Sequence, residues 1–187
     1  VEGKFANRSF LIDQMGKVVA KYDKIHMFDV DISETESYRE SATYERGTKA
    51  VLAKTDFGIV GLSVCYDVRF PHLYRALAQA GAEILTVPAA FAQTTGQAHW
   101  HALLRARAIE NGAYILAPAQ TGLHYTKDGK ERRTYGHSLV VSPWGEVLID
   151  AGVEAGVAYF DIDLAEVSRA RSRVASLTQS RVFEGPQ

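Results

Sequence analysis

The sequence contains a single cysteine, Cys65, so a disulfide within the chain is excluded and this residue is a free thiol. It also lacks any hydrophobic run near the roughly 20 apolar residues that a membrane-spanning helix requires. Its first residues do not resemble a secretory signal peptide. A fold that needs no oxidising compartment and no membrane anchor is typical of the cytoplasm. We therefore expect a cytoplasmic protein without a membrane partner.

An excess of charge of one sign is missing as well. The 187 residues include 21 basic and 22 acidic side chains, for a net charge of −1, and neither kind forms long runs. Such a chain has no field that would attract nucleic acid or an anionic lipid surface. Nucleic acid is therefore not an expected partner, whereas a small neutral or acidic molecule is allowed.

The chain does have enough apolar sequence for the core of one domain. Hydrophobic residues make up 47% and charged residues 23%, and we treat residues 1–187 as a single domain. Periodicity and turn residues predict strands at 8–12, 17–21, 59–64, 84–87, 114–117, 138–141, 146–149 and 157–160. Helices are predicted at 71–80 and 97–111, a helix or extended tail at 163–177, and a long polar surface loop at 29–50. The alternation of strands and helices in the middle of the chain predicts an α/β sheet.

Cys65 has two interpretations. A free cysteine is most often a small buried hydrophobe. This one, however, follows the apolar run 59–64 and precedes the helix 71–80, so it lies at the carboxyl end of a strand, where α/β sheets bind ligands. Backbone N–H groups at such a turn, notably that of Tyr66, favour thiolate and could stabilise an oxyanion. The position makes Cys65 a candidate nucleophile.

A thiol needs a base or a nearby cation for efficient attack, because only a few per cent of it is ionised at pH 7. Six histidines are present, and a Cys–His pair cannot be assigned among them from composition. His99 and His101 form an H-x-H pair, but residues two apart on a helix point to different faces. We therefore expect no metal site.

Five ordered segments carry a family resemblance. They are 22–28 (YDKIHMF), Glu40-Ser41 with Gly47, 61–71 (GLSVCYDVRFP), 105–111 (RARAIEN), and 136–138 with 143–145 (GHS and PWG). Together they resemble the lysine, second-glutamate, nucleophile and two further signatures of the nitrilase superfamily, the carbon–nitrogen hydrolases. The resemblance extends from about residue 5 to residue 183.

The resemblance implies a fold and a reaction. The fold is an α/β four-layer αββα sandwich, normally a homodimer or a higher homo-oligomer. The reaction is hydrolysis of a small linear amide through a cysteine thioester, without a cofactor. Residues 90–100 (AFAQTTGQAHW) are similar to the branch of deaminated glutathione amidases and ω-amidases, which act on α-keto amides, and 119–122 (AQTG) favours the former. N-carbamoyl and aliphatic amide hydrolysis are the alternatives within the superfamily.

The resemblance also implies roles for individual residues. Cys65 would be the nucleophile, Lys24 the cation that stabilises the oxyanion, and Glu40 the second glutamate, near the lysine and the water that hydrolyses the thioester.

Four residues are expected to bind substrate. Tyr66 would donate its N–H, Phe91 would pack against the acyl group, and Thr94 and His99 would make polar contacts with a keto acid.

Four other positions have a structural interpretation on physical grounds. Asp67 and Arg69 are expected to form a positioning ion pair beside the thiol. Glu110 is expected to pair with Arg107, three positions before it on a helix. Trp100 is expected in the core, because its helical neighbours are apolar.

One departure from the family pattern matters. The general base of the family is a further glutamate well upstream of the lysine motif, and Glu2 does not match it. We expect that the N-terminal strands and helices that carry this glutamate are missing from the sequence. Without the base, proton transfer would lose about 10² to 10⁴ in rate. An inactive fragment that serves as a binding or dimerisation module is the alternative to an amidase.

Overall fold

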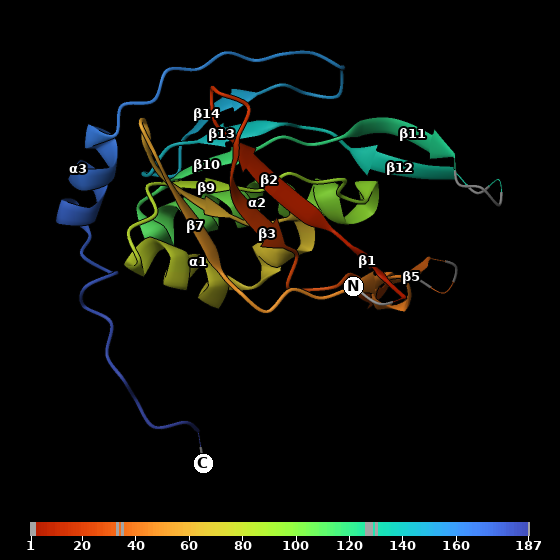
Figure 1. Ribbon diagram of the computed structural model, residues 1–187, viewed down its shortest axis with the longest axis horizontal. Helices are drawn as coiled ribbons and strands as arrows, with labels where there is room; N and C mark the ends of the chain where they lie inside the picture. Colours follow the sequence, from red (N-terminus) through yellow and green to blue (C-terminus); the bar gives the residue numbers. More distant parts are fainter. Residues whose placement is uncertain (1–2, 33, 35, 126–128, 130, 187) are drawn as a thin grey trace.

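A six-stranded sheet forms the centre of the molecule. The computed structural model describes residues 3–32, 34, 36–125, 129 and 131–186 (Figure 1). The strand order is β14-β13-β10-β9-β8-β7, in which the middle strands β8, β9 and β10 are parallel and their outer neighbours are antiparallel. The strands are β7 (Val51–Thr55), β8 (Gly58–Leu62), β9 (Ile84–Thr86), β10 (Tyr114–Ala117), β13 (Leu139–Val141) and β14 (Val147–Asp150). The predicted α/β sheet is confirmed.

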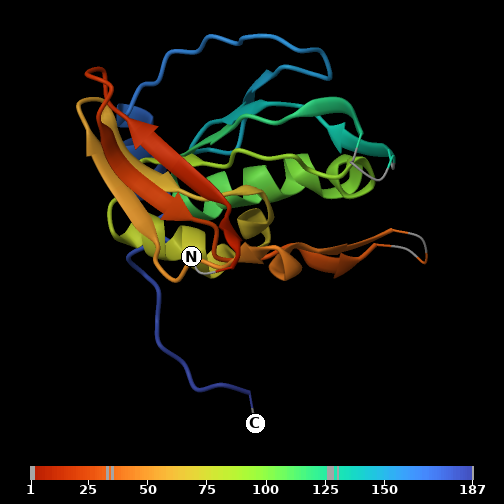
Figure 2. The same ribbon diagram turned by 45° about the vertical axis from the view of Figure 1, so that its right-hand side comes forward.

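Two helices cover one face of this sheet. α1 (Pro71–Gln79) connects β8 to β9, and α2 (Gln93–Asn111) connects β9 to β10. Both connections lead to the next strand on the same side, in the order β8, β9, β10. Right-handed crossovers in the same direction put both helices on one face of the sheet, where they contact each other (Figure 2). α2 begins at Gln93, four residues before the predicted start, and Gly96 lies in its first turns where the helix packs closely on Tyr135.

The core lies between these helices and the sheet. Trp100 and Leu104 of α2, Leu77 of α1 and Leu85 of β9 are almost fully buried. Trp100 also donates its indole N–H to the carbonyl of His137 at 2.8 Å. The prediction that Trp100 belongs to the core is confirmed.

A hairpin precedes the sheet. β2 (Arg8–Ile12) and β3 (Val18–Asp23) pair antiparallel around a turn, as predicted, and β3 lies beside β7. β1 (Phe5–Ala6) pairs in parallel with β6 (Tyr44–Glu45). Phe10 and Ile12 on the outer side of β2 are more than half exposed.

Two further hairpins project to the same side of the molecule (Figures 1 and 2). One is β4 (Asp29–Asp31) with β5 (Ser37–Arg39), followed by the short 3₁₀ helix η1 (Glu40–Ala42); the other is β11 (Thr121–Tyr125) with β12 (Glu131–Tyr135). The prediction of a loop across 29–50 is therefore wrong in part. These strands are short and polar, so they lack the apolar alternation by which strands are recognised.

The C-terminal region differs from prediction at one strand. α3 (Ala165–Arg173) confirms a helix there, and Arg171 anchors it by donating to the carbonyls of Asn111 and Ala82. The strand predicted at 157–160 is absent, since no strand of the described residues pairs with this segment, and Val157 and Tyr159 are mostly exposed. Beyond α3 the chain extends away from the body (Figure 1). None of the described helices is long and apolar enough to cross a membrane.

Candidate active site

Cys65 lies just beyond the carboxyl end of β8, where the sequence places it. It opens the 3₁₀ helix η2 (Cys65–Arg69), and α1 begins only afterwards, so the helix that directly follows the thiol is a single short turn. The φ of Cys65 is +50°, and its N–H donates to the carbonyl of Pro88 at 3.0 Å. A positive φ at a residue with a side chain costs on the order of 1 kcal/mol and persists where the surroundings impose it, often at functional sites.

Lys24 and Glu40 form a buried ion pair next to this thiol. Lys24 is 2% exposed, and its Nζ contacts Glu40 Oε2 at hydrogen-bonding range. Glu40 also accepts the N–H of Phe28 at 2.6 Å and the side-chain amide of Asn7 at 3.0 Å. Burial alone would raise the pKa of Glu40, but Lys24 first, and then these two donors, lower it below its ordinary value. Glu40 is therefore ionised at neutral pH and holds the ammonium of Lys24 in place.

The backbone around Lys24 requires a glycine at position 47. The N–H of Gly47 donates to the carbonyl of Lys24 at 2.7 Å. A Cβ at position 47 would clash with the backbone carbonyl of Asp23. The glycine of the second-glutamate segment thus allows the chain to pass closely behind the lysine.

Asp67 connects the cysteine turn to the lysine segment. It is fully buried, and its carboxylate accepts the Tyr22 hydroxyl at 2.7 Å and the N–H of Val64 at 2.8 Å. Its other oxygen accepts the N–H of His26 at 3.1 Å and faces His26 Nδ1 at 2.7 Å. The expected ion pair of Asp67 with Arg69 is not formed, because this carboxylate is used to join η2 to the end of β3.

Burial and nearby charge have opposite effects on the pKa of the Cys65 thiol. Burial raises the pKa of the thiol above its ordinary value, while the charge of Lys24 and the backbone N–H of Ala90 act in the opposite direction. The net shift is upward. A backbone N–H does favour thiolate, as predicted, but burial outweighs this effect, and the thiol lies beside a cation that would stabilise negative charge when it develops.

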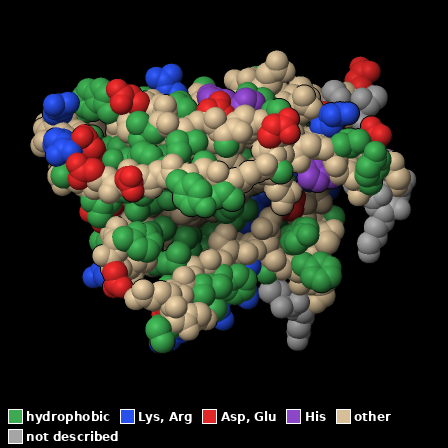
Figure 3. All heavy atoms as spheres, turned by 90° about the horizontal axis from the view of Figure 1, so that it is seen from above, with side chains coloured by type: hydrophobic (Ala, Val, Ile, Leu, Met, Phe, Trp, Pro, Cys, Tyr) green, Lys and Arg blue, Asp and Glu red, His purple; other side chains and the backbone are tan. Residues whose placement is uncertain are grey.

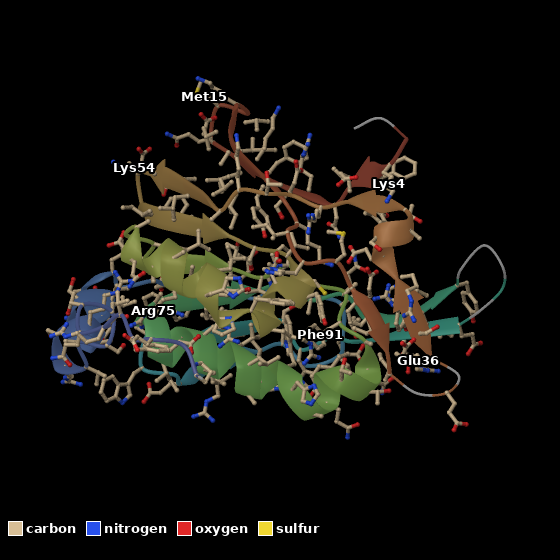
Figure 4. All side chains as sticks on the ribbon, turned by 90° about the horizontal axis from the view of Figure 1, so that it is seen from below. Lys4, Met15, Glu36, Lys54, Arg75 and Phe91 are labelled. Carbon is tan, nitrogen blue, oxygen red and sulfur yellow. The ribbon has the colours of Figure 1, made fainter. Side chains whose placement is uncertain are left out.

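The site opens into a cavity of about 880 Å³. Cys65, Lys24 and Glu40 line it together with Tyr66 and Phe91, so the structure brings five of the seven predicted site residues into one space. Glu40 is the sole acidic residue lining the cavity among those described. Figure 4 shows Phe91 beside the helical layer, and Figure 3 shows hydrophobic side chains gathered on the face seen from above.

Thr94 and His99 lie elsewhere. Both are exposed on α2 and neither lines the cavity, whereas the neighbouring Thr95 does. His99 faces the guanidinium of Arg69 at 3.3 Å. The guanidinium in turn lies 5.3 Å from the centroid of the Phe91 ring. Arg69 and His99 thus support the wall formed by Phe91 from outside.

The structure also shows the expected Arg107–Glu110 ion pair and the positions of the H-x-H histidines. Arg107 Nη1 pairs with Glu110 at 2.7 Å, as predicted, and Arg107 Nε donates to the carbonyl of Val68 within the cysteine turn. His101 does not converge with His99. It contacts Asp150 at 3.0 Å, and His137 contacts the same carboxylate at 2.9 Å.

The group formed by His101, His137 and Asp150 is the candidate for a metal among the described residues, since its ligand atoms lie within 4.8 Å of one another. Both histidines contact the Asp150 carboxylate within the group. The absence of a metal stays a prediction.

Several cavity residues were missed from sequence. Asn7, Tyr38 and Arg132 line the cavity, and Asn7 supports Glu40 directly. Asn7 follows a two-residue strand, and Tyr38 and Arg132 lie on polar hairpins without a periodic signal. In the structure, exposure alternates along β12 and places Arg132 on its inner face. This alternation could not be seen in the sequence, because the strand itself was not predicted.

Comparison with known proteins extends these observations. The carbon–nitrogen hydrolase family matches residues 1–172. A deaminated glutathione amidase from Synechocystis sp. (strain PCC 6803 / GT-S) is 48% identical over 183 residues, covering 97% of this chain and 65% of that protein. The structure of the C. elegans NitFhit protein has a TM-score of 0.87 at 40% identity, covering 96% of this chain and 43% of that one.

A third relative informs the chemistry. It is a mutant amidase from Nesterenkonia sp. AN1, with 31% identity and a TM-score of 0.69, covering 92% of this chain and 60% of that one. Its structure shows covalent addition of the acetamide moiety of fluoroacetamide at the active-site cysteine. The chain thus spans less than two thirds of the length of each of these three proteins.

Proposed function

Because this chain belongs to the carbon–nitrogen hydrolase family and has its α/β fold, we propose that it hydrolyses small linear amides through a thioester on Cys65. One observation carries the proposal: a cysteine in a strained turn, a buried lysine and its glutamate partner line the same cavity. The covalent adduct on the active-site cysteine of the Nesterenkonia amidase supports the role of Cys65.

The first half of the reaction forms the thioester. The Cys65 sulfur attacks the amide carbonyl carbon, so that a C–S bond forms and the carbonyl oxygen becomes an oxyanion. The C–N bond then breaks, and the proton from the thiol leaves with the amine. The leaving group is ammonia or an amine, and the acyl group remains on sulfur.

We assign stabilisation of the oxyanion to two groups. The ammonium of Lys24 acts by charge: at about 4 Å and an effective dielectric near 20, such an interaction is worth about 4 kcal/mol. The N–H of Tyr66 supplies a hydrogen bond, since it has no acceptor within the described part of the chain. Glu40 holds the ammonium of Lys24 in position through their ion pair.

The second half of the reaction is hydrolysis of the thioester. Water adds to the acyl carbon, the C–S bond breaks, and the water proton returns to sulfur. Glu40 lines the same cavity as Cys65, and we assign to it the orientation of this water. Because Glu40 is held as the ionised partner of the lysine, we do not assign the proton transfers to it.

The proposed substrate is an α-keto amide resembling deaminated glutathione. The name of the Synechocystis relative supports it, and a cavity of about 880 Å³ has room for an acyl group of several carbons together with its leaving group. ω-Amidase, N-carbamoyl and aliphatic amidase activities are the alternatives. The cytoplasmic location expected from the composition and the homodimer or higher homo-oligomer implied by the resemblance stay predictions.

A product assay tests the proposal. The full-length protein is incubated with deaminated glutathione, α-ketoglutaramate, an N-carbamoyl amino acid and propionamide, and the released amine is measured. We expect turnover to be fastest with deaminated glutathione and to fall at least 10³-fold in Cys65→Ala. Turnover that survives this substitution contradicts the mechanism. Absence of turnover together with an unreactive thiol supports the alternative of a binding or dimerisation module.

A further inference from the structure

Two histidines and an aspartate from three parts of the fold meet at one point. His101 lies on α2, His137 precedes β13, and Asp150 is the last residue of β14. His101 Nε2 lies 3.0 Å from one oxygen of the Asp150 carboxylate, and His137 Nδ1 lies 2.9 Å from the other. One ligand atom from each residue lies within 4.8 Å of the other two. The fold therefore brings together three potential metal ligands that are far apart in the sequence.

The backbone of His137 has an unusual conformation. Its φ is +54°, and among the described residues other than glycine only Cys65 also has a positive φ. Its N–H donates to the carbonyl of Gly152 at 2.6 Å, and its carbonyl accepts the indole N–H of Trp100. Strain that the surroundings impose in this way is often found at functional sites. His137 does not line the cavity around Cys65, so the proposed hydrolysis does not account for its strain.

The side chains of the group are held in place by further contacts. The Asp150 carboxylate accepts the N–H of Gly152 at 2.9 Å. The ring of Tyr135 stacks on that of His137, with 4.3 Å between the ring centroids. Ligands that are fixed before an ion arrives lose little conformational freedom when it binds.

The distances within the group are close to those that a metal ion requires. Zn²⁺ binds histidine nitrogen and carboxylate oxygen at about 2.0 to 2.2 Å, so in tetrahedral geometry neighbouring ligand atoms lie roughly 3.4 Å apart. The distances of 3.0 Å for His101 and 2.9 Å for His137 are shorter by a few tenths of an ångström. Small side-chain movements would therefore admit an ion, with each imidazole presenting a lone pair to it.

The group is also accessible and has a suitable set of donors. The side chains of His101 and Asp150 are each 34% exposed, and that of His137 is 24% exposed. An ion and its bound water can therefore reach the group. Two imidazoles and one carboxylate, with water in the fourth position, form a known class of open zinc site, and imidazole also suits Cu²⁺ and Ni²⁺.

We propose that His101, His137 and Asp150 form a binding site for a divalent transition metal ion of the Zn²⁺ class, separate from the cavity around Cys65. The ion joins α2 to the segment before β13 and to the end of β14. Ser138, which follows His137, lines the cavity, so the ion holds one wall in place without contacting the reacting atoms. Such a site would overturn the expectation of no metal, which was drawn from the pair His99 and His101.

Titration of the full-length protein with Co²⁺, a coloured substitute for Zn²⁺, tests the site. Cys65→Ala is the parent protein, because it removes the thiol as a competing ligand, and EDTA treatment removes metals beforehand. We expect a visible absorption band from bound Co²⁺ that Zn²⁺ abolishes by displacement. His101→Gln should weaken Co²⁺ binding at least about tenfold, since changing even an outer-shell partner of a metal costs 10- to 100-fold in affinity. Zn²⁺ should raise the melting temperature of the parent more than that of His101→Gln.

His99→Gln is the matched control, because it changes an exposed histidine two positions away on α2 whose ring contacts Arg69 and no member of the group. It should bind Co²⁺ as the parent does. Asp150→Asn keeps the shape of the carboxylate and should also weaken binding, so it replaces His101→Gln if thermal unfolding without metal shows that variant to be misfolded. Absence of Co²⁺ binding to the parent, or binding that His101→Gln and Asp150→Asn leave unchanged or that His99→Gln reduces equally, overturns the proposal.

Discussion

At Cys65, the protonation state of the nucleophile depends on a balance of burial and charge. Burial raises the pKa of the thiol, and Lys24 is the principal group that opposes it. Since the net shift is upward, less thiolate is present at pH 7 than in an exposed cysteine. The lysine therefore contributes most when the amide oxygen becomes negative during attack, and less by ionising the thiol beforehand.

This balance predicts a pH dependence of alkylation. The rate at which iodoacetamide modifies Cys65 should increase with pH and reach its midpoint above the ordinary cysteine pKa. Lys24→Met should move the midpoint higher, because it removes the cation that favours thiolate. Mass spectrometry of the alkylated protein at a series of pH values measures both midpoints.

The double variant Lys24→Met/Glu40→Gln is the control for that experiment. It removes the whole ion pair, including the negative charge that disfavours thiolate, so its midpoint should lie between those of the wild type and Lys24→Met. A midpoint that does not change in Lys24→Met shows that the lysine does not influence the thiol.

At the scale of elements, the turn η2 and the end of β3 are joined through one carboxylate. Asp67 receives hydrogen bonds from both, and neither segment pairs with the other as a sheet. The relative position of Cys65 and Lys24 therefore depends on the Asp67 side chain, whose hydrogen bonds within the described part of the chain go to neither the sulfur nor the ammonium.

Asp67→Asn should separate the two elements. The amide keeps the shape of the carboxylate but loses its charge and one acceptor, and we expect the free energy of unfolding to fall by about 2 to 4 kcal/mol. Turnover should fall as well, because the nucleophile and the cation are no longer held together. Urea unfolding and the amide assay measure the two effects.

Two variants control for general effects of that change. Asp56→Asn makes the same chemical change in an exposed turn and should alter stability by less than about 0.5 kcal/mol. Tyr22→Phe removes one hydrogen bond to Asp67 and should cost about 1 to 2 kcal/mol. An Asp67→Asn variant as stable and active as the wild type would remove Asp67 from its connecting role.

Elements with strong apolar patterns were predictable from the sequence, and polar ones were not. The buried run at 59–64 and the stripe of Leu73 and Leu77 correctly indicated β8 and α1, and with them the position of Cys65. Lys24 and Glu40 required the family resemblance, since each alone looks like an exposed charge. Arg132 was not predicted, because its strand has no apolar periodicity and its partner Tyr38 is 94 positions away.

At the scale of the whole molecule, the described chain exposes apolar surface on one hairpin. Phe10 and Ile12 lie two positions apart on β2, and Val18 pairs with Ile12 from β3. These side chains are 51%, 58% and 40% exposed. Clusters of this kind mark surfaces that pack against protein.

An isolated polypeptide of residues 1–187 should therefore bind the dye ANS and self-associate. Phe10→Ser/Ile12→Ser should reduce both, because it removes the apolar side chains from this face. ANS fluorescence and sedimentation velocity are the measurements. Phe183→Ser, at an exposed position of the C-terminal tail, should change neither. A monomer that does not bind ANS would show that the exposed hairpin is no association surface.

The division of the cavity wall between the central sheet and two outer hairpins has a consequence for how new activities arise. The thiol turn grows from β8, whereas Tyr38 and Arg132 belong to hairpins that share no strand with the central sheet. Mutations in the hairpins can therefore change which acyl group is accepted without disturbing the reactive turn. Natural evolution and laboratory selection can therefore change substrate specificity at these hairpin positions while the catalytic turn is kept.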